Sequence, residues 1–292
     1  MSNTATGANV DSHVRAVTDE EVEAFQGYGW AYLPGLLSTE LAKELLAHLK
    51  HVTGMDYDEL PPDHPDAFAF TRRLREQGIF KIFAMPRLQD ELVWEYASSR
   101  ALGVASARLS KHSSMRLYSD GVICKMPSWM GEQNLLTGPQ AGVYTGETPW
   151  HQDYSQIPWD RRGGVQFWLA LSEITPEMGS LQYLSGSHRE GPLGAGIYDE
   201  QVLRDDHPEL WGKYDVSPKH HLQPGDVIAH DSLIVHYAEP NMTNRMRWVY
   251  TTYRMRSDTL YTGAPTSRLT EYGIEFKQWK PFEHPKFPIV SG

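Results

Sequence analysis

The sequence contains a single cysteine, Cys124, among its 292 residues. One cysteine excludes an intrachain disulfide and any metal site built from several thiolates, so a metal would have to be held by histidines and carboxylates. No apolar run approaches the roughly 18 residues that cross a bilayer. The first residues also lack the basic and apolar segments of a secretory signal. We therefore expect a cytoplasmic protein that makes no membrane contact.

Basic residues are in deficit, with 27 Lys and Arg against 37 Asp and Glu and a formal net charge of -10. This balance gives no long-range attraction for nucleic acid and argues against a large polyanionic substrate such as a CoA thioester. Hydrophobic residues make up 40% of the chain, which is enough for a sizeable core. We expect the protein to bind a small molecule and no nucleic acid, and to be a monomer or a homodimer.

The N-terminal part of the sequence has helical patterning. We expect residues 1–16 to be a flexible leader and residues 17–292 to form one domain. Thr18 and Glu21 have the spacing of a capping box at the start of a helix. A short strand over residues 30–33 and a second helix capped by Ser38 follow.

From about residue 114 the patterning changes to the two-residue alternation of strands. It is clearest over residues 165–171, 227–237 and 247–254, which Gly, Pro and Asp turns separate. Several such strands predict an antiparallel sandwich or barrel behind N-terminal helices. The segment between Gly186 and Pro224 has little periodicity, and we interpret it as a lid over the mouth of a site.

The motif Pro149-Trp-His-Gln-Asp places His151 and Asp153 two residues apart. On an extended strand these side chains project from one face, which brings an imidazole and a carboxylate together. The pair alone is weak evidence, because surface polar residues often have this spacing. A third ligand from elsewhere in the chain is needed.

Thirteen histidines are available, and most lie in the leader, on a helix, in turns, before proline or beside lysine. His230 and His236 remain, in one apolar run. An uninterrupted strand would separate them by about 20 Å, so only one can be a ligand. Arg247 follows His236 by eleven residues and suits a bidentate grip on a carboxylate, whereas the same offset from His230 reaches Asn241. We therefore choose His236.

Two histidines and one carboxylate with open positions are the facial triad of non-haem iron oxygenases. Zinc could use the same ligands in a hydrolase or a cupin-type isomerase, and a binding module that has lost catalysis is a third alternative. Arg247 favours the oxygenase.

The chain resembles the phytanoyl-CoA dioxygenase family of iron(II)- and 2-oxoglutarate-dependent oxygenases. The resemblance covers most of residues 18–256 and rests on FQGYGWAYLPGLL, TPWHQD, FWLALSEITPEMGSLQYLSGSHR, QPGDVIAHDSLIVHYAEPN and RMRWVYTTYR. It implies a double-stranded β-helix, a jelly roll of mainly β structure with N-terminal helices.

The resemblance also implies roles for particular residues. His151, Asp153 and His236 would bind Fe(II), and Arg247 would hold the distal carboxylate of 2-oxoglutarate. Trp168 and Gln133 would line the cosubstrate pocket, although Trp168 could equally be core.

The implied reaction consumes O2 and 2-oxoglutarate and releases succinate and CO2. Hydroxylation of an unactivated carbon is the default outcome, with desaturation, epoxidation or ring rearrangement as variants. The resemblance also argues against a halogenase, because those relatives replace the carboxylate of Asp153.

Aromatic and sulfur side chains near the motifs suggest a hydrophobic metabolite or natural-product intermediate of secondary metabolism as the substrate. Alternatively, these side chains belong to the hydrophobic core. They are Tyr118, Met126, Trp129, Tyr144, Tyr154 and Trp159.

Overall fold

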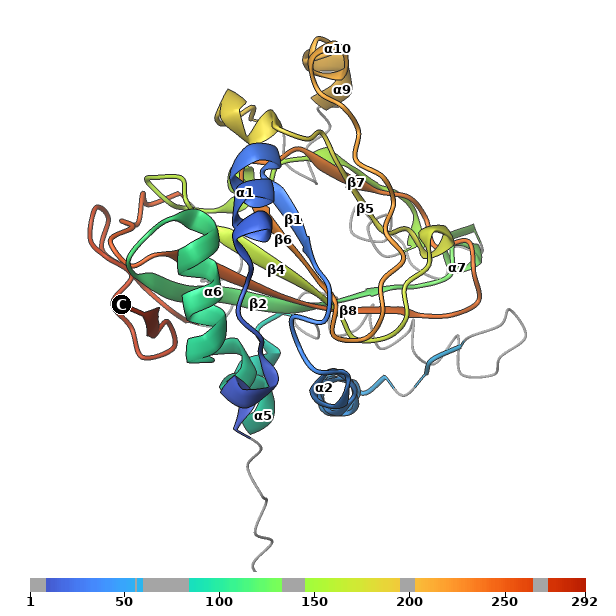
Figure 1. Ribbon diagram of the computed structural model, residues 1–292, viewed down its shortest axis with the longest axis horizontal. Helices are drawn as coiled ribbons and strands as arrows, with labels where there is room; N and C mark the ends of the chain where they lie inside the picture. The colour runs from blue at the N-terminus through green and yellow to red at the C-terminus, as the bar shows by residue number, and fades with distance from the viewer. Residues whose placement is uncertain (1–8, 56, 60–83, 133–144, 195–202, 265–272) are drawn as a thin grey trace, which may run out of the picture.

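The computed structural model describes residues 9–55, 57–59, 84–132, 145–194, 203–264 and 273–292. Their strands form two antiparallel sheets, a larger one ordered β1-β6-β4-β8-β2-β9 and a smaller one ordered β3-β7-β5 (Figure 1). The strands are β1 (Trp30–Leu33), β2 (Met115–Lys125), β3 (Thr148–His151), β4 (Val165–Ala170), β5 (Leu181–Tyr183), β6 (Val227–Asp231), β7 (His236–Ala238), β8 (Arg247–Arg256) and β9 (Ile289–Ser291). The expected mainly β jelly roll is confirmed.

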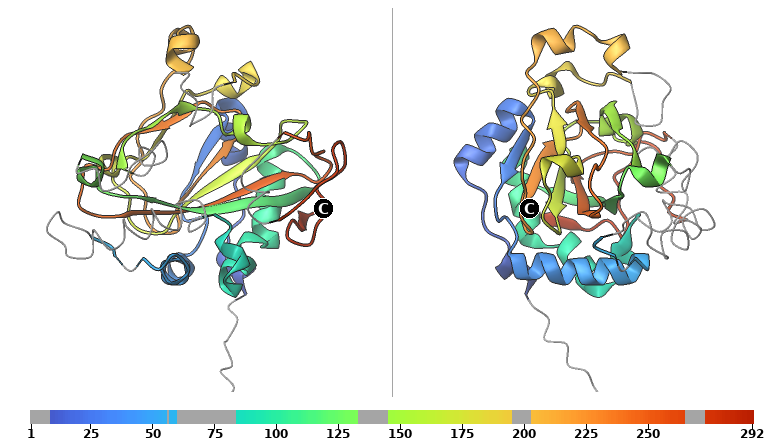
Figure 2. Two further views of the ribbon diagram at one scale, coloured as in Figure 1. Left: turned by 180° about the vertical axis from the view of Figure 1, so that it is seen from behind. Right: turned by 90° about the vertical axis from the view of Figure 1, so that its right-hand side faces the viewer.

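Helices lie on two opposite sides of the strands. In Figures 1 and 2, α2 and α5 lie on one side and α9 and α10 on the other. The helices are α1 (Asp19–Tyr28), α2 (Thr39–Thr53), α5 (Glu91–Ala97), α6 (Arg100–Ser110), α7 (Trp129–Glu132), α9 (Leu203–Asp206) and α10 (Leu210–Lys213). As predicted, Thr18 and Ser38 cap α1 and α2, and Thr18 and Glu21 complete the capping box.

The central strands of the larger sheet, β6, β4, β8 and β2, are largely buried on both faces. On β8, Trp248 and Tyr250 belong to the core that includes apolar residues of α2, α5 and α6. Val249, between them, belongs to a second core with Trp168 of β4. Because successive side chains of a strand point to opposite faces, Arg247 and Tyr253 share the inner face with Val249. The larger sheet thus presents polar residues to the interior of the barrel.

One predicted strand is wrong. Residues 227–237 do not form one continuous strand, because β6 ends at Asp231 and β7 begins at His236 in the other sheet. The Asp231 carboxylate accepts a hydrogen bond from the Leu233 amide at 2.8 Å, and its carbonyl accepts one from the Ile234 amide at 3.1 Å. An aspartate that bonds the backbone two residues on stabilises a turn, which breaks the strand here.

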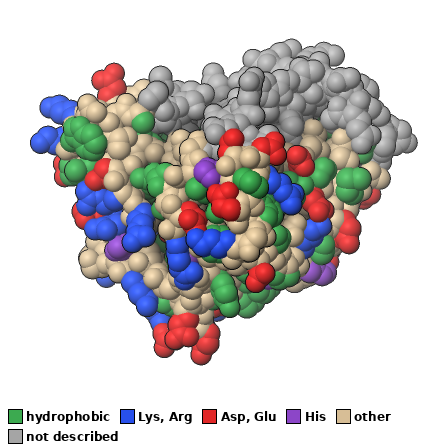
Figure 3. All heavy atoms as spheres, turned by 90° about the horizontal axis from the view of Figure 1, so that it is seen from above, with side chains coloured by type: hydrophobic (Ala, Val, Ile, Leu, Met, Phe, Trp, Pro, Cys, Tyr) green, Lys and Arg blue, Asp and Glu red, His purple; other side chains and the backbone are tan. Residues whose placement is uncertain are grey.

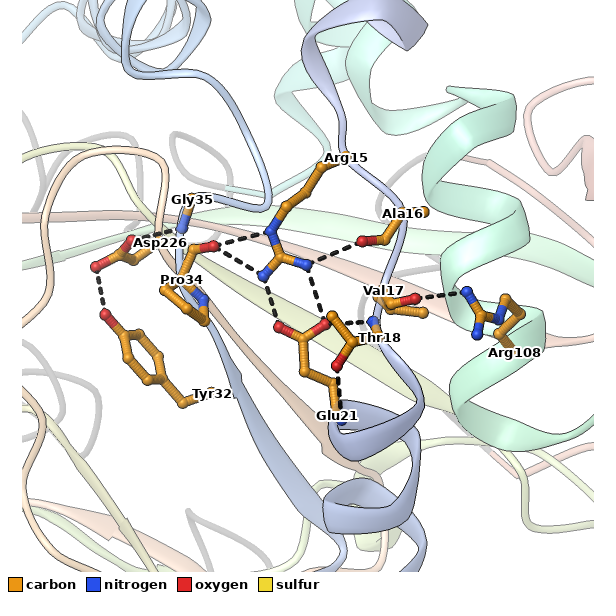
Figure 4. Close-up of polar contacts among 10 residues, drawn as sticks. All are labelled: Arg15, Ala16, Val17, Thr18, Glu21, Tyr32, Pro34, Gly35, Arg108 and Asp226. Atoms are coloured by element: carbon orange, nitrogen blue, oxygen red, sulfur yellow. Dashed lines mark hydrogen bonds and ion pairs between the residues drawn. The ribbon is translucent and has the colours of Figure 1, made fainter.

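The expected leader is also partly ordered. Val10–His13 form a 3-10 turn, and Val14 bridges Leu37. Arg15 binds the Glu21 carboxylate through two nitrogens, at 3.0 and 2.6 Å (Figure 4). Ordered structure therefore begins before residue 17, where the domain was expected to start.

The expected lid segment packs on the outside of the smaller sheet where it is described. Leu203 and Leu210 of α9 and α10 are buried in a cluster with Leu184 and Val235. Bridges from Leu184 to Val216 and from Ile174 to Leu222 fix its second half. The lid itself stays a prediction.

The surface drawn in Figure 3 carries basic and acidic side chains interspersed over the described residues. Within the described ranges, no helix is both long and apolar enough to span a bilayer.

Asp226 fixes the first strand to the barrel. Its carboxylate accepts hydrogen bonds from the Tyr32 hydroxyl and the Gly35 amide, each at 2.7 Å (Figure 4). It also accepts one from the Gln223 amide at 2.8 Å. Tyr32 lies on β1, so the contact fixes β1 against β6.

We predict that Asp226→Ala lowers the free energy of unfolding by about 2–4 kcal/mol, because three donors lose a charged acceptor. Urea denaturation measures the change. Asp58→Ala is the control, since the side chain of Asp58 is 74% exposed and makes one ion pair with Lys50. Its loss should cost at most about 1 kcal/mol. Equal effects of the two substitutions would contradict this role for Asp226.

Candidate metal centre

Three side chains with metal-binding atoms converge between the two sheets. One such group exists in the part of the chain that the structure describes, and it consists of His151, Asp153 and His236. One candidate ligand atom from each lies within 4.8 Å of the others. His151 ends β3 and pairs in register with His236 at the start of β7, and their ring centroids are 4.2 Å apart.

Asp153 reaches the group by a different route from the one expected. The strand ends at His151, and Asp153 begins a 3-10 turn that runs to Gln156. Strand alternation alone therefore does not place the carboxylate. The turn brings Asp153 Oδ1 to 3.6 Å from His151 Nε2, and Oδ2 to 3.9 Å from His236 Nε2.

Backbone carbonyls fix the orientation of both imidazoles. His151 Nδ1 lies 2.7 Å from the Pro149 carbonyl oxygen, and His236 Nδ1 lies 3.1 Å from that of Ile234. Because a carbonyl only accepts, each Nδ1 carries a proton and donates it. Each Nε2 then keeps its lone pair and faces Asp153, as in metal-binding histidines.

The ionisation of the group favours metal binding. Burial, and after it the neighbouring His151, lower the pKa of His236 to about 3, so its ring is neutral. Burial opposes the charge on Asp153, but His236, His151 and His230 outweigh it and hold the pKa of the carboxyl well below its usual range. A neutral imidazole and an ionised carboxylate are the forms that bind metals.

His230 is much closer to this group than the sequence predicted. Because the strand breaks after Asp231, the ring centroids of His230 and His236 are 5.0 Å apart rather than about 20 Å. His230 is fully buried, and its Nε2 lies 3.4 Å from Asp153 Oδ2. It is not one of the three converging ligands, but it contacts one of them.

Arg247 lies inside the barrel, as predicted. Its guanidinium carbon lies 5.1 Å from the centroid of the Trp168 ring, which is also buried. One terminal nitrogen donates to the Gly179 carbonyl, while Nε is buried without a hydrogen-bond partner. Burial lowers the pKa of Arg247 to about 9. Gln133, the other residue expected here, lies outside the described residues.

Sequence reasoning missed Lys125, which pairs with Arg247 across β2 and β8. Lys125 is fully buried, and its Nζ donates to Thr148 Oγ1 at 3.1 Å and the Ala238 carbonyl at 3.3 Å. Burial, followed by the charge of Arg247, lowers the pKa of Lys125 well below its ordinary value. Neither base forms an ion pair with a described carboxylate. The only signal in the sequence was a lysine that ends a strand-like run.

The aromatic residues near the motifs divide between two cores. Tyr118 and Trp159 are buried with Tyr253 in a cluster on the inner side of β8. Met126 belongs instead to the core beneath the helices, and Trp129 packs against that core. Tyr154 packs beside Trp159 and donates its hydroxyl to the Trp159 carbonyl at 3.0 Å. Tyr144 lies outside the described residues.

Gln152, between the two motif residues, connects them to neighbouring loops. Its amide nitrogen donates to the carbonyls of Gly191 and Leu233 at 2.9 and 2.6 Å. Its amide oxygen accepts from the Leu193 amide at 2.8 Å. The start of the expected lid segment is therefore attached directly to the metal-site motif.

Comparison with known proteins gives both a family and a fold. The family model for phytanoyl-CoA dioxygenase matches residues 25–249. A phytanoyl-CoA dioxygenase domain-containing protein 1 homolog of Dictyostelium discoideum is 29% identical over 148 residues, 49% of this chain and 50% of that protein. A phytanoyl-CoA dioxygenase of Arabidopsis thaliana is 25% identical over 126 residues, 43% of this chain and 44% of that protein. The chain thus matches about half the length of these curated relatives.

Solved structures share the fold. The non-haem alpha-ketoglutarate-dependent carbocyclase SnoK from nogalamycin biosynthesis superposes with a TM-score of 0.71 at 18% identity, over 98% of this chain and 100% of its own. EctD from S. alaskensis, solved with 2-oxoglutarate and 5-hydroxyectoine, superposes with a TM-score of 0.62 at 18% identity. The match covers 87% of this chain and 83% of that chain. The family model covers well over half of the sequence, so the expected resemblance is confirmed and the chain belongs to the phytanoyl-CoA dioxygenase family.

Proposed function

We propose that this protein is an iron(II)- and 2-oxoglutarate-dependent dioxygenase that binds iron through His151, Asp153 and His236. It oxidises an unactivated carbon of a small hydrophobic metabolite or natural-product intermediate, and hydroxylation is the default outcome. Succinate and CO2 are the by-products. The observation that carries the proposal is a buried arginine without a carboxylate partner among the described residues, inside the same barrel as the triad.

The donor set fits iron(II). Two imidazole nitrogens and one carboxylate occupy one side of a metal and leave the other positions open for cosubstrate and dioxygen. When bound there, iron with 2-oxoglutarate and O2 would supply the oxidising chemistry. The protein contributes the orientation of the ligands and a site enclosed by the two sheets. The carbonyls of Pro149 and Ile234 keep the two nitrogens aimed inward.

Arg247 and Lys125 distinguish this proposal from a zinc hydrolase. Desolvation penalises a buried guanidinium that has no anion beside it. The distal carboxylate of 2-oxoglutarate would offset that penalty, and a planar guanidinium can bind it through two parallel hydrogen bonds. The Trp168 ring lies beside the guanidinium, 5.1 Å from its central carbon to the ring centroid. Hydrolysis at a zinc-bound water does not itself require a second, anionic cosubstrate.

The surroundings of the centre support a hydrophobic substrate. Tyr253 contacts Asp153 and belongs to the same apolar cluster as Tyr118 and Trp159, so one side of the centre is aromatic. The similar structures include enzymes named for nogalamycin biosynthesis, which favours a natural-product intermediate. The expected location in the cytoplasm, and a monomeric or homodimeric state, stay predictions.

Anaerobic reconstitution tests the proposal. Fe(II) and 2-oxoglutarate added together to the protein should produce a weak visible charge-transfer band at roughly 500 nm that neither produces alone. Admitting air should then form succinate. Turnover of a substrate without 2-oxoglutarate or O2 would instead support a zinc hydrolase or cupin-type isomerase, and absence of both band and turnover would indicate a binding module.

We predict that His151→Ala, Asp153→Ala and His236→Ala each abolish Fe(II) binding, because two remaining protein ligands leave the site incomplete. Anaerobic equilibrium dialysis measures the bound iron. His221→Ala is the control, since its side chain is 52% exposed and lies outside the converging group. Retention of iron by any of the three variants at the level of the control would remove that residue from the ligand set.

We predict that Arg247→Lys weakens 2-oxoglutarate binding by about 10- to 100-fold, or about 1.5–3 kcal/mol, because an ammonium cannot reproduce the two hydrogen bonds of a guanidinium. Titration of the visible band with 2-oxoglutarate gives the affinity. The matched control is Arg256→Lys on the same strand, whose guanidinium binds Asp258 at the surface. Equal affinities in both variants would refute the role assigned to Arg247.

A further inference from the structure

The two oxygens of the Asp153 carboxylate have different surroundings. Oδ2 accepts a hydrogen bond from the Tyr253 hydroxyl at 2.8 Å, and His230 Nε2 lies 3.4 Å from the same oxygen. Oδ1 lies 3.6 Å from His151 Nε2, and Oδ2 also lies 3.9 Å from His236 Nε2. Tyr253 comes from β8 and His230 from β6, so the larger sheet supplies both groups that hold Oδ2.

The hydrogen bonds of His230 can be assigned from its partners. A carboxylate only accepts, so the nitrogen that faces Asp153 carries the proton. On the other side of the ring, Nδ1 lies 3.0 Å from the Tyr183 hydroxyl and is hydrogen-bonded to it. Tyr183 is fully buried and stacks on Trp30, with ring centroids 5.3 Å apart. A chain of hydrogen bonds thus connects Tyr183 through His230 to Asp153.

We infer that Tyr253, His230 and Tyr183 are positioning residues that restrict Asp153 to binding the metal through Oδ1. This inference rests on the proposed function. A carboxylate without such partners can rotate and bind a metal through both oxygens, which would occupy a position that cosubstrate or dioxygen needs. Two donors on Oδ2 oppose that rotation, since it would leave two partly buried hydrogen bonds unmade.

The three residues lie on three strands, β5, β6 and β8, which belong to both sheets. Because His236 pairs in register with Tyr183, the same strand pairing that places a metal ligand also places the first residue of this chain of hydrogen bonds. Removing a partner that orients a metal ligand typically costs about 10- to 100-fold in metal affinity.

Cobalt(II) binding to the full-length protein tests this inference. Its visible spectrum reports the number of ligands, and its titration gives a dissociation constant without turnover. Tyr253→Phe removes one hydroxyl and keeps the ring. We expect it to raise the dissociation constant of cobalt(II) about 10- to 100-fold and to change the shape of the visible spectrum. Tyr183→Phe should produce a smaller loss of affinity.

Tyr250→Phe is the matched control. Tyr250 lies on the same strand, and its hydroxyl also donates to a buried carboxylate, Asp120 Oδ2 at 2.6 Å. It faces the core beneath the helices rather than the metal centre. The control should lower the thermal unfolding midpoint and leave cobalt(II) affinity and spectrum unchanged.

Three outcomes would overturn the proposals in distinguishable ways. Equal cobalt(II) affinities and spectra for Tyr253→Phe and Tyr250→Phe would overturn the positioning role alone, provided that the parent binds cobalt(II) and His151→Ala does not. Loss of binding in His230→Gln as complete as in His236→Ala would make His230 a ligand instead. A parent protein that binds no cobalt(II) would overturn the metal centre itself.

Discussion

The register of the smaller sheet is the constraint on which the site depends. His151 pairs with His236, and His236 pairs with Tyr183, so three short strands bring two imidazoles and a phenol side by side. A slip of one residue would turn His236 to the outer face and remove a ligand. Gln152 stabilises this register, because it binds the turn that precedes β7 and the loop that follows β5.

The larger sheet contributes the groups that surround the ligands. Its outer face packs against the helices, so its inner face can carry polar residues without exposing the core. Those residues include Arg247 at the start of β8, Lys125 opposite it at the end of β2, and Tyr253 toward the other end of β8. Burying two bases without carboxylate partners lowers stability, and an anionic cosubstrate would restore part of it by binding only the folded state. With the cosubstrate role proposed for Arg247, the site would gain affinity for an anion at the expense of the stability of the free protein.

Local sequence signals predicted the elements that depend on local interactions. The caps at Thr18 and Ser38, and the alternation in β4 and β8, are properties of neighbouring residues, and each element formed where expected. The triad was also found from the sequence, because the His151 and Asp153 spacing and the offset from His236 to Arg247 restrict the choice strongly.

Features that depend on long-range contacts were not predictable in this way. The apolar run over residues 227–237 hides the turn at Asp231, so His230 was placed far from His236 although their rings lie 5.0 Å apart. Lys125 was missed because its position opposite Arg247 follows from pairing between strands more than one hundred residues apart. In both cases the position of the side chain follows from turn geometry or strand register rather than from the residue type.

In the proposed function, the triad and Arg247 together couple the oxidation of a substrate to the decarboxylation of 2-oxoglutarate. The most direct measurement is mass spectrometry of the succinate that the iron-loaded protein forms from 2-oxoglutarate under heavy-isotope dioxygen. We predict one heavy oxygen atom in the new carboxylate of succinate. Unlabelled succinate, or none from protein shown to bind both iron and 2-oxoglutarate, would contradict it.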